Sequence, residues 1–110
     1  MTEAEFLRLY KQTLVQIEET VETAINELDT DIDYESANDM LTLNFNNGSV
    51  AIISRQSAIS QLWLAARSGG FHFDYDAAGS KWVCTVNERS LQDMLTEICL
   101  EQGAVTLAFP

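Results

Sequence analysis

The hydrophobic period of this chain changes twice, and these changes constrain its fold more than any other feature of the sequence. Over the first quarter of the chain, apolar residues recur every three or four positions, which predicts one amphipathic helix over about residues 3–27. The apolar positions are Phe6, Tyr10, Leu14, Ile17, Val21, Ala24 and Leu28. Thr2 followed by Glu5 is a capping-box pattern, which places the start of the helix directly after Thr2.

Between residues 31 and 86 the period shortens to two, which is typical of β-strands. The alternating segments are residues 31–35, 41–45, 49–56, 60–66, 71–76 and 81–86. Asn47-Gly48 predicts a hairpin turn with positive φ at both central positions, and Gly69-Gly70 interrupts the pattern before the fifth segment. Short turns between consecutive strands predict an antiparallel sheet.

Helical spacing returns after residue 90, with Ser90 as the expected N-cap and Gly103 as the expected stop. The order is therefore a helix, about six strands and a second helix. This order predicts the α+β class, in the form of a two-layer α/β sandwich with the N- and C-terminal helices packed on one face of an antiparallel sheet. The chain contains no repeat or linker, so we expect one domain over residues 1–110, with the other face of the sheet in water.

Acidic residues are concentrated in the first third of the chain. Residues 1–39 hold eleven of the seventeen acids against Arg8 and Lys11, a net charge of −9 out of the total of −11. This charge excludes nucleic acid as a partner, because phosphates require Lys and Arg, and it favours cations or a basic protein surface. No apolar run approaches the roughly 20 residues of a membrane span and the N-terminus lacks a signal-peptide pattern, so we expect a cytoplasmic protein without membrane contact.

The densest run of carboxylates lies between residues 18 and 35, where no Lys, Arg or His interrupts it. Its members are Glu18, Glu19, Glu22, Glu27, Asp29, Asp31, Asp33 and Glu35. One interpretation is a solvated surface that improves solubility and blocks edge-to-edge aggregation. The other is a surface of weak, exchangeable sites for hard cations, which prefer carboxylate oxygen. A calcium loop is excluded, because Tyr34 and Met40 stand where that motif needs Gly and Glu.

The remaining reactive side chains do not form a catalytic constellation. His72 is the only histidine and has no neighbouring nucleophile, so we interpret it as a surface histidine on a strand. Cys84 and Cys99 lack metal or redox spacing, and we expect reduced, buried thiols. Trp63 has the opposite parity to Leu62, which leaves two interpretations open: a covered side chain, or an exposed aromatic anchor for a partner. The sequence therefore predicts a protein that is not an enzyme.

The segment SRQSAISQLWLAARSGGFHFDYD, together with the preceding FNNGS hairpin and the acidic first helix, resembles the bacterial branch of the frataxin family over nearly the whole chain. The resemblance implies the same sandwich fold. It also implies a non-catalytic iron-binding adaptor and regulator of iron-sulfur cluster assembly. Such a protein would bind Fe2+ or Fe3+ weakly and exchangeably, with other divalent cations as alternatives. It would dock on the cysteine desulfurase that supplies sulfur, with the scaffold protein as a further candidate partner.

The resemblance assigns these roles to two groups of residues. The acidic ridge, as we name it, comprises Glu18, Glu19, Glu22, Asp29, Asp31 and Asp33, with Glu3 as an addition to the metal-binding set. Partner contacts are assigned to Trp63, Arg55 and Gln56 on the sheet face and to Glu18, Glu19 and Glu22 of the ridge. Thr23, Ser54 and Ala58 depart from the family pattern. We expect a monomer without iron. The alternative function is ferroxidase-like iron oxidation or iron storage, and a third is a charged scaffold with no metal role.

Overall fold

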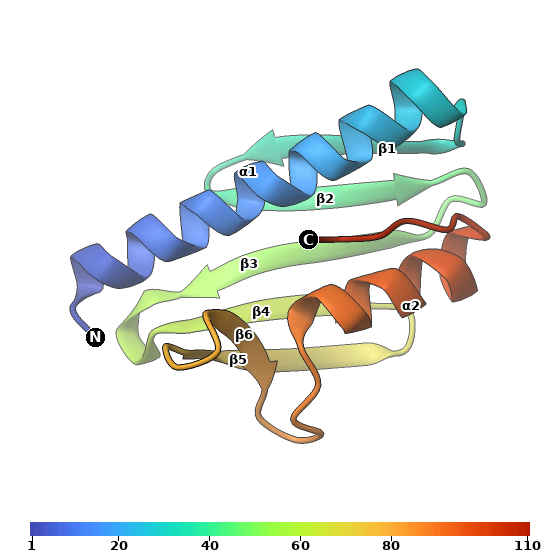
Figure 1. Cartoon of the computed structure of the whole chain (residues 1–110). Helices are drawn as coiled ribbons and strands as arrows, with labels where there is room; N and C mark the ends of the chain where they lie inside the picture. The colour runs from blue at the N-terminus through green and yellow to red at the C-terminus, as the bar shows by residue number, and fades with distance from the viewer.

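Two helices cover one face of a six-stranded antiparallel sheet in the computed structural model, which describes residues 1–110 (Figure 1). The helices are α1 (Glu3–Leu28) and α2 (Leu91–Gly103). The strands are β1 (Ile32–Ala37), β2 (Met40–Phe45), β3 (Val50–Gln56), β4 (Gln61–Ala66), β5 (Gly69–Asp76) and β6 (Lys81–Cys84), with a short 3₁₀ turn at Ser57–Ile59. Each strand pairs with the next along the chain, so the predicted two-layer α+β sandwich is confirmed.

Side-chain caps set the start of both helices. The Thr2 hydroxyl oxygen accepts the Glu5 backbone N–H at 3.1 Å, and the Ser90 hydroxyl oxygen accepts the Asp93 N–H at 3.2 Å, as the sequence predicts. The end of α2 differs from the prediction. Gly103 is the last helical residue, and Ala104 adopts the left-handed conformation with φ 54° in its place.

The buried face of α1 packs against the inward side chains of the sheet in one core of 24 residues. At its centre the Trp82 indole N–H donates to the Thr13 hydroxyl at 2.9 Å, and that hydroxyl donates to the Leu9 carbonyl oxygen at 2.8 Å. The tail after α2 runs back between the two helices and buries Val105 and Leu107 (Figure 1). The tail therefore fills the space between the two helices in the helix layer (Figure 1). Neither helix is both long and apolar enough to span a membrane.

The turns differ from the sequence prediction in detail. The two-residue turn with positive φ at both positions lies at Asn38 and Asp39, with φ 56° and 60°. At the predicted site only Gly48 has positive φ, and its N–H donates to the Phe45 carbonyl. The reason is register: β2 and β3 pair up to Asn44 and Val50, which leaves a loop too long for a two-residue turn.

Two strand boundaries also differ from the sequence prediction. Gly69 and Gly70 lie within β5, because they pair with the end of β4, and the turn itself is made by Arg67 and Ser68. The sixth strand ends at Cys84 instead of continuing to residue 86. These shifts do not change which residues face the core, since the alternation within each strand is preserved.

At Gly103 we expect even the addition of one methyl group to lower the stability of the protein. A Cβ atom added there would lie 2.2 Å from Cδ1 of the buried Phe45 ring. Gly103→Ala should therefore lower the free energy of unfolding by about 1–3 kcal/mol, the usual cost of overpacking, despite the better helix propensity of Ala. Urea denaturation checks this expectation.

Gly70→Ala is the matched control for this prediction. It adds the same methyl group where no atom lies within 4 Å of the new Cβ, and its φ needs no glycine. The control should change stability by less than about 0.5 kcal/mol, the usual range for surface substitutions. Equal unfolding midpoints for the two variants would contradict the close contact between α2 and Phe45.

Candidate functional site

The acidic ridge follows the second half of α1 and continues into the edge strand β1. Glu18 and Glu22 act together on Tyr34, a half-buried side chain of β1. Hydrogen bonding to the Glu22 carboxylate, then burial and the charges of Glu22, Glu18 and Asp33, raise the pKa of the Tyr34 phenol. Carboxylates from the helix and from the strand therefore contribute to one local negative field at this edge of the sheet.

Asp31 and Asp33 line an open hollow together with Asn44 and Asn46 of the neighbouring strand and loop. The Asn46 side-chain amide donates to Asp31 at 3.4 Å, and one oxygen of Asp33 accepts the Tyr34 backbone N–H at 2.8 Å. Each carboxylate keeps further lone pairs for a ligand. Neighbouring carboxylate and amide oxygens are metal ligands of the kind that hard cations prefer.

The structure separates other members of the predicted metal set. Glu19 lines a different hollow, with Thr23 and the C-terminal Pro110. Asp29 is the exposed C-cap of α1, in the left-handed conformation with φ 50°. Glu3 lies fifteen residues before Glu18 on the same helix, a distance of about 22 Å along the axis. A single ion cannot contact both carboxylates at this distance. Glu3 therefore lies apart from the ridge, at the other end of the same helix.

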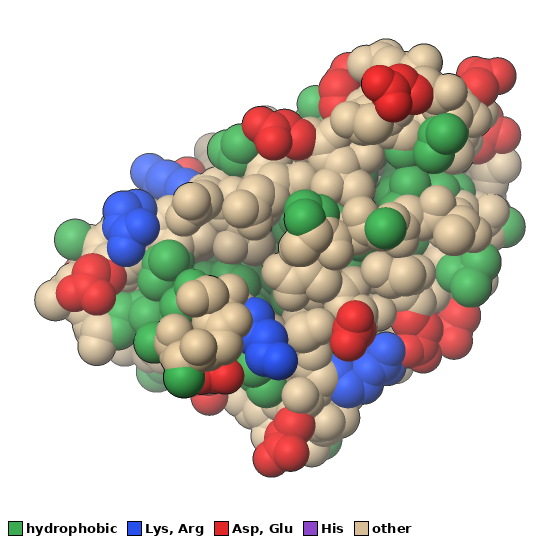
Figure 2. Space-filling model, in the orientation of Figure 1, with side chains coloured by type: hydrophobic (Ala, Val, Ile, Leu, Met, Phe, Trp, Pro, Cys, Tyr) green, Lys and Arg blue, Asp and Glu red, His purple; other side chains and the backbone are tan.

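The ridge carboxylates have no cationic partner within the protein. The two ion pairs of the molecule join Arg55 to Asp39 and Arg89 to Glu97, and both lie outside the ridge. Figure 2 shows acidic side chains around the end of α1 with no basic side chain among them. No three Asp, Glu, His or Cys side chains are grouped so that they could hold one metal ion. The ridge is therefore an open, uncompensated surface and not a closed coordination cage.

Trp63 lies on the open face of the sheet and is partly exposed. Its ring stacks on His72 of β5, with ring centroids 4.2 Å apart and an interplanar angle of 10°. Its indole N–H donates to the Gln61 side chain at 3.1 Å, and the Gln61 amide donates to Asp74 at 3.1 Å. Of the two interpretations that the sequence left open, the structure shows a combination: Trp63 is on the uncovered face, and a neighbouring side chain covers one side of its ring.

Arg55 and Gln56 lie on opposite sides of the sheet, although both were assigned to one contact surface. Gln56 shares the open face with Trp63, whereas Arg55 pairs with the buried Leu62 and points to the covered face. There its guanidinium donates to the Asp39 carboxylate at 2.9 Å and to the Ser57 hydroxyl. The placement of Arg55 on the sheet face with Trp63 is therefore wrong, because neighbouring residues of a strand alternate sides.

Several polar residues of these surfaces carried no prediction from the sequence. Asn44 lies opposite Asp33 across β1 and β2, and Gln61 joins Trp63 to Asp74. The alternation of Asn44 with Leu43 was a signal that it faces outward. Its partner across the strands depends on register, which the sequence leaves open when the turn lengths are uncertain.

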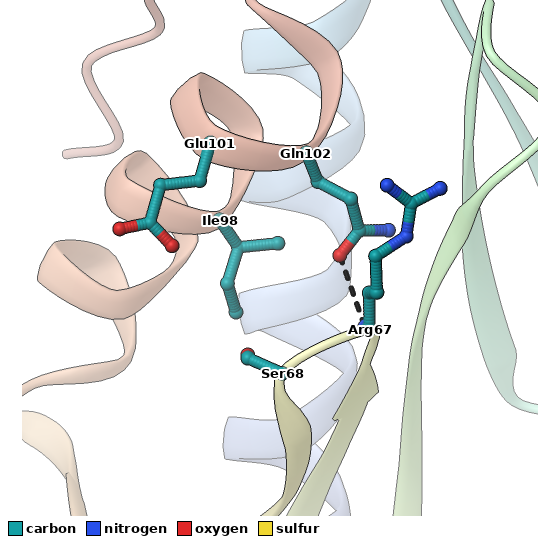
Figure 3. A pocket seen from close by; sticks show the side chains of 5 residues that line it. All are labelled: Arg67, Ser68, Ile98, Glu101 and Gln102. Atoms are coloured by element: carbon teal, nitrogen blue, oxygen red, sulfur yellow. Dashed lines mark hydrogen bonds between the residues drawn. The ribbon is translucent and has the colours of Figure 1, made fainter.

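A third hollow lies between the end of α2 and the β4–β5 turn (Figure 3). It measures about 180 Å³, below the roughly 300 Å³ at which small-molecule pockets begin. Its buried amide, Gln102, is already occupied: Oε1 accepts the Arg67 backbone N–H at 3.0 Å, and Nε2 donates to the Val50 carbonyl at 2.7 Å. Glu101 points away from Arg67 (Figure 3). We interpret this region as a tie between α2 and the sheet.

Both cysteines are free and buried, as the sequence predicts. Burial raises the pKa of the Cys99 thiol to about 12, so its reactive thiolate is scarce at neutral pH. Cys84 is 1 % exposed. We expect neither thiol to react with a disulfide reagent in the native protein at about pH 8, and both to react after denaturation. A thiol that reacts in the native protein faster than the chain unfolds would contradict this burial.

The fold and the ridge define a class of protein: a two-layer sandwich that offers open charged and aromatic surfaces. The comparisons with known proteins give the family. Residues 1–104 match the family model described as a frataxin-like domain, and the chain belongs to this family.

Relatives agree over almost the full length of the chain. The iron-sulfur cluster assembly protein CyaY of Pseudomonas fluorescens is 49 % identical over 109 residues, which cover 99 % of this chain and 96 % of that protein. The protein of the same name from Azotobacter vinelandii is 44 % identical over 110 residues, covering 100 % and 96 %. The solved structure of frataxin from Psychromonas ingrahamii superposes with a TM-score of 0.87 at 33 % identity, covering 100 % of this chain and 99 % of that one.

Proposed function

We propose that this protein is an iron-binding adaptor that regulates iron-sulfur cluster assembly. The observation that carries the proposal is the acidic ridge, a run of exposed or partly exposed carboxylates without any internal cationic partner. Like charges held together destabilise a fold, so their retention is best explained by partners outside the chain. The name of the relatives, iron-sulfur cluster assembly protein, supports the choice of pathway.

Iron is the first of these external partners. Ferrous and ferric ions accept oxygen ligands, and the ridge supplies carboxylates from α1 and β1 with the amide oxygens of Asn44 and Asn46 beside them. Since no three acidic side chains converge, each ion would have few protein ligands and would keep much of its water. Binding is therefore weak and exchangeable, and other divalent cations compete for the same oxygens.

The second partner is a cysteine desulfurase that presents a basic surface to the ridge. The ridge carboxylates Glu18, Glu19 and Glu22 would provide long-range attraction, and Trp63 with Gln56 would provide contacts on the adjoining open sheet face. Arg55 lies on the covered side of the sheet, so a partner on the open face would reach it only by extending past the C-terminal end of β3. The scaffold protein of cluster assembly is a further candidate for the open face.

Competition between iron and the desulfurase for one surface would make the protein a regulator. A bound ion reduces the negative charge of the ridge, so iron occupancy should change the affinity for a basic partner. The test is to measure the dissociation constant of the desulfurase complex without metal and with ferrous iron under anaerobic conditions. An affinity that is the same in both states would contradict the regulatory proposal.

Salt dependence tests the electrostatic part separately. Exposed charges are screened over about 8 Å at physiological ionic strength, so raising the salt from about 50 to about 300 mM should weaken the complex several-fold. An affinity independent of salt would indicate that the ridge does not take part in docking.

The alternative function, iron oxidation or storage, requires closely spaced bridged metals. The open ridge without histidine does not favour such a centre. Catalysed oxygen consumption at a fixed ratio of iron to protein would support this alternative over the adaptor.

A further inference from the structure

The open face of the sheet carries a stacked pair that the adaptor role does not by itself require. His72 and Trp63 lie directly opposite each other on β5 and β4. Their rings are nearly parallel, 10° apart in orientation, with centroids separated by 4.2 Å. His72 is the only histidine of the chain, and Trp63 is the tryptophan on this face, since Trp82 is 1 % exposed.

The stack is held in place by a chain of hydrogen bonds. Asp74 accepts from the Gln61 amide, and Gln61 accepts the Trp63 indole N–H, each at 3.1 Å. The indole is thus fixed at its nitrogen and covered by imidazole on one side. Any change in the charge of His72 acts on a tryptophan that has little freedom to move away from it.

The surroundings of His72 contain few charges that could mask its own. Opposite it on β4, the open face carries the neutral Trp63 and Gln61, and the β6 side carries the neutral Val83 and Thr85. On β5 itself, Asp74 is the nearest carboxylate along the strand, and Asp76 follows opposite Lys81. No helix covers this face of the sheet (Figure 1).

From this geometry we infer that His72 makes docking on the open sheet face dependent on proton concentration. Histidine is the side chain that changes charge between about pH 5 and 8. A protonated His72 opposes the Asp74 charge and adds a cation to the ring face of Trp63, where it is held by cation–π attraction. Both changes place positive charge where a basic partner would approach. Docking of a basic protein surface therefore weakens as the pH falls.

This inference rests on the proposed docking of a basic partner, but its first step can be tested on the protein alone. The indole N–H signals of Trp63 and Trp82 in a ¹⁵N-labelled sample are followed from about pH 8 to 5.5, a range above the usual titration of carboxylates. The Trp63 signal should move through one transition, while the buried Trp82 signal stays in place. His72→Phe keeps an aromatic ring on Trp63 without a proton to gain, so its Trp63 signal should not move. A transition of the same size in the variant, or none in the native protein, would overturn the inference.

The second step measures docking. The affinity for the desulfurase should fall between about pH 8 and 6 by about two- to fivefold more for the native protein than for His72→Phe, as expected for one exposed charge interaction. Comparing the two proteins at each pH cancels the titration of the partner. His72→Lys, which is charged at both pH values, should bind weakly at both. Equal pH dependence of native protein and His72→Phe would contradict this inference alone, whereas no binding at either pH would contradict the proposed function as well.

Discussion

Replacing Glu18, Glu19 and Glu22 together with glutamine should weaken the binding of ferrous iron and of the desulfurase by about three- to 150-fold, because three surface charge interactions of about 0.2–1 kcal/mol each are lost. The same variant should fold normally and be as stable as the native protein or more stable. Glutamine preserves the size and helix preference of glutamate, and it removes repulsion within the ridge. Thermal denaturation and isothermal titration calorimetry measure the two effects.

A control with the same change of net charge separates local from general electrostatics. Glu88, Asp93 and Glu101 lie in or near α2, away from the ridge, and form no ion pair. Their joint replacement by the corresponding amides should leave iron binding unchanged and affect docking only weakly. If the ridge variant unfolds, the ridge is a structural element, and if both variants lose the same affinity, the position of the charge is irrelevant.

The second large effect is expected at Trp82, and Trp63 provides the contrast. Trp82 is almost fully buried, its ring packs edge-on against Phe6 and Tyr75, and its indole N–H is bonded to Thr13. Trp82→Ala should therefore cost about 3–5 kcal/mol, as large truncations in a core do. This is a major part of the roughly 5–15 kcal/mol that stabilises a domain of this size. Urea denaturation measures the loss.

Trp63→Ala should have the opposite profile. Its cross-strand stack with His72 contributes about 0.2–1 kcal/mol to stability, so the fold should persist. Docking on the desulfurase should weaken by about 30-fold, the effect of removing an interface hot spot, while iron binding should not change. A loss of stability for Trp63→Ala equal to that for Trp82→Ala would place Trp63 in the core and contradict its role in docking.

The two layers of the fold could be predicted from the sequence because buried residues recur at the spacing of a helix or of a strand. The apolar positions of α1 at three- and four-residue steps, from Phe6 to Ala24, are buried as predicted, whereas Leu28 at the end of the helix is exposed. The alternation of Leu62 and Leu64 with Trp63 also assigns the faces of β4 correctly. These predictions succeed because a side chain on the wrong face would expose apolar surface to water.

Two details of the turns and helix ends differ from the sequence prediction, each for its own reason. Asn38-Asp39 forms the tight turn without a glycine because Asn and Asp tolerate the left-handed conformation better than other residues. Gly103 lies inside α2 and not after it. The absence of a side chain at Gly103 leaves room for the ring of Phe45, which is far away in the chain. No local pattern contains that information.

The candidate site was predictable in composition and less so in geometry. The concentration of acids on α1 and β1 was visible in the sequence, but their division into a β1-facing group and Glu19 beside the C-terminal tail was not. The prediction for Arg55 was wrong because the resemblance assigned it a partner contact but did not specify the side of the sheet on which it lies. The pairing of Trp63 with His72 depended on the register of β4 and β5, which the tertiary structure supplies.

The central proposal is that the ridge binds both iron and a basic protein surface. The most direct measurement is an NMR titration of the ¹⁵N-labelled protein, first with ferrous iron under anaerobic conditions and then with the cysteine desulfurase. Iron should broaden and shift signals of residues 18 to 35 and of the adjoining Asn44 and Asn46, and the enzyme should extend these changes to Trp63. Changes spread evenly over the chain, or no response to either partner, would contradict the role of the ridge.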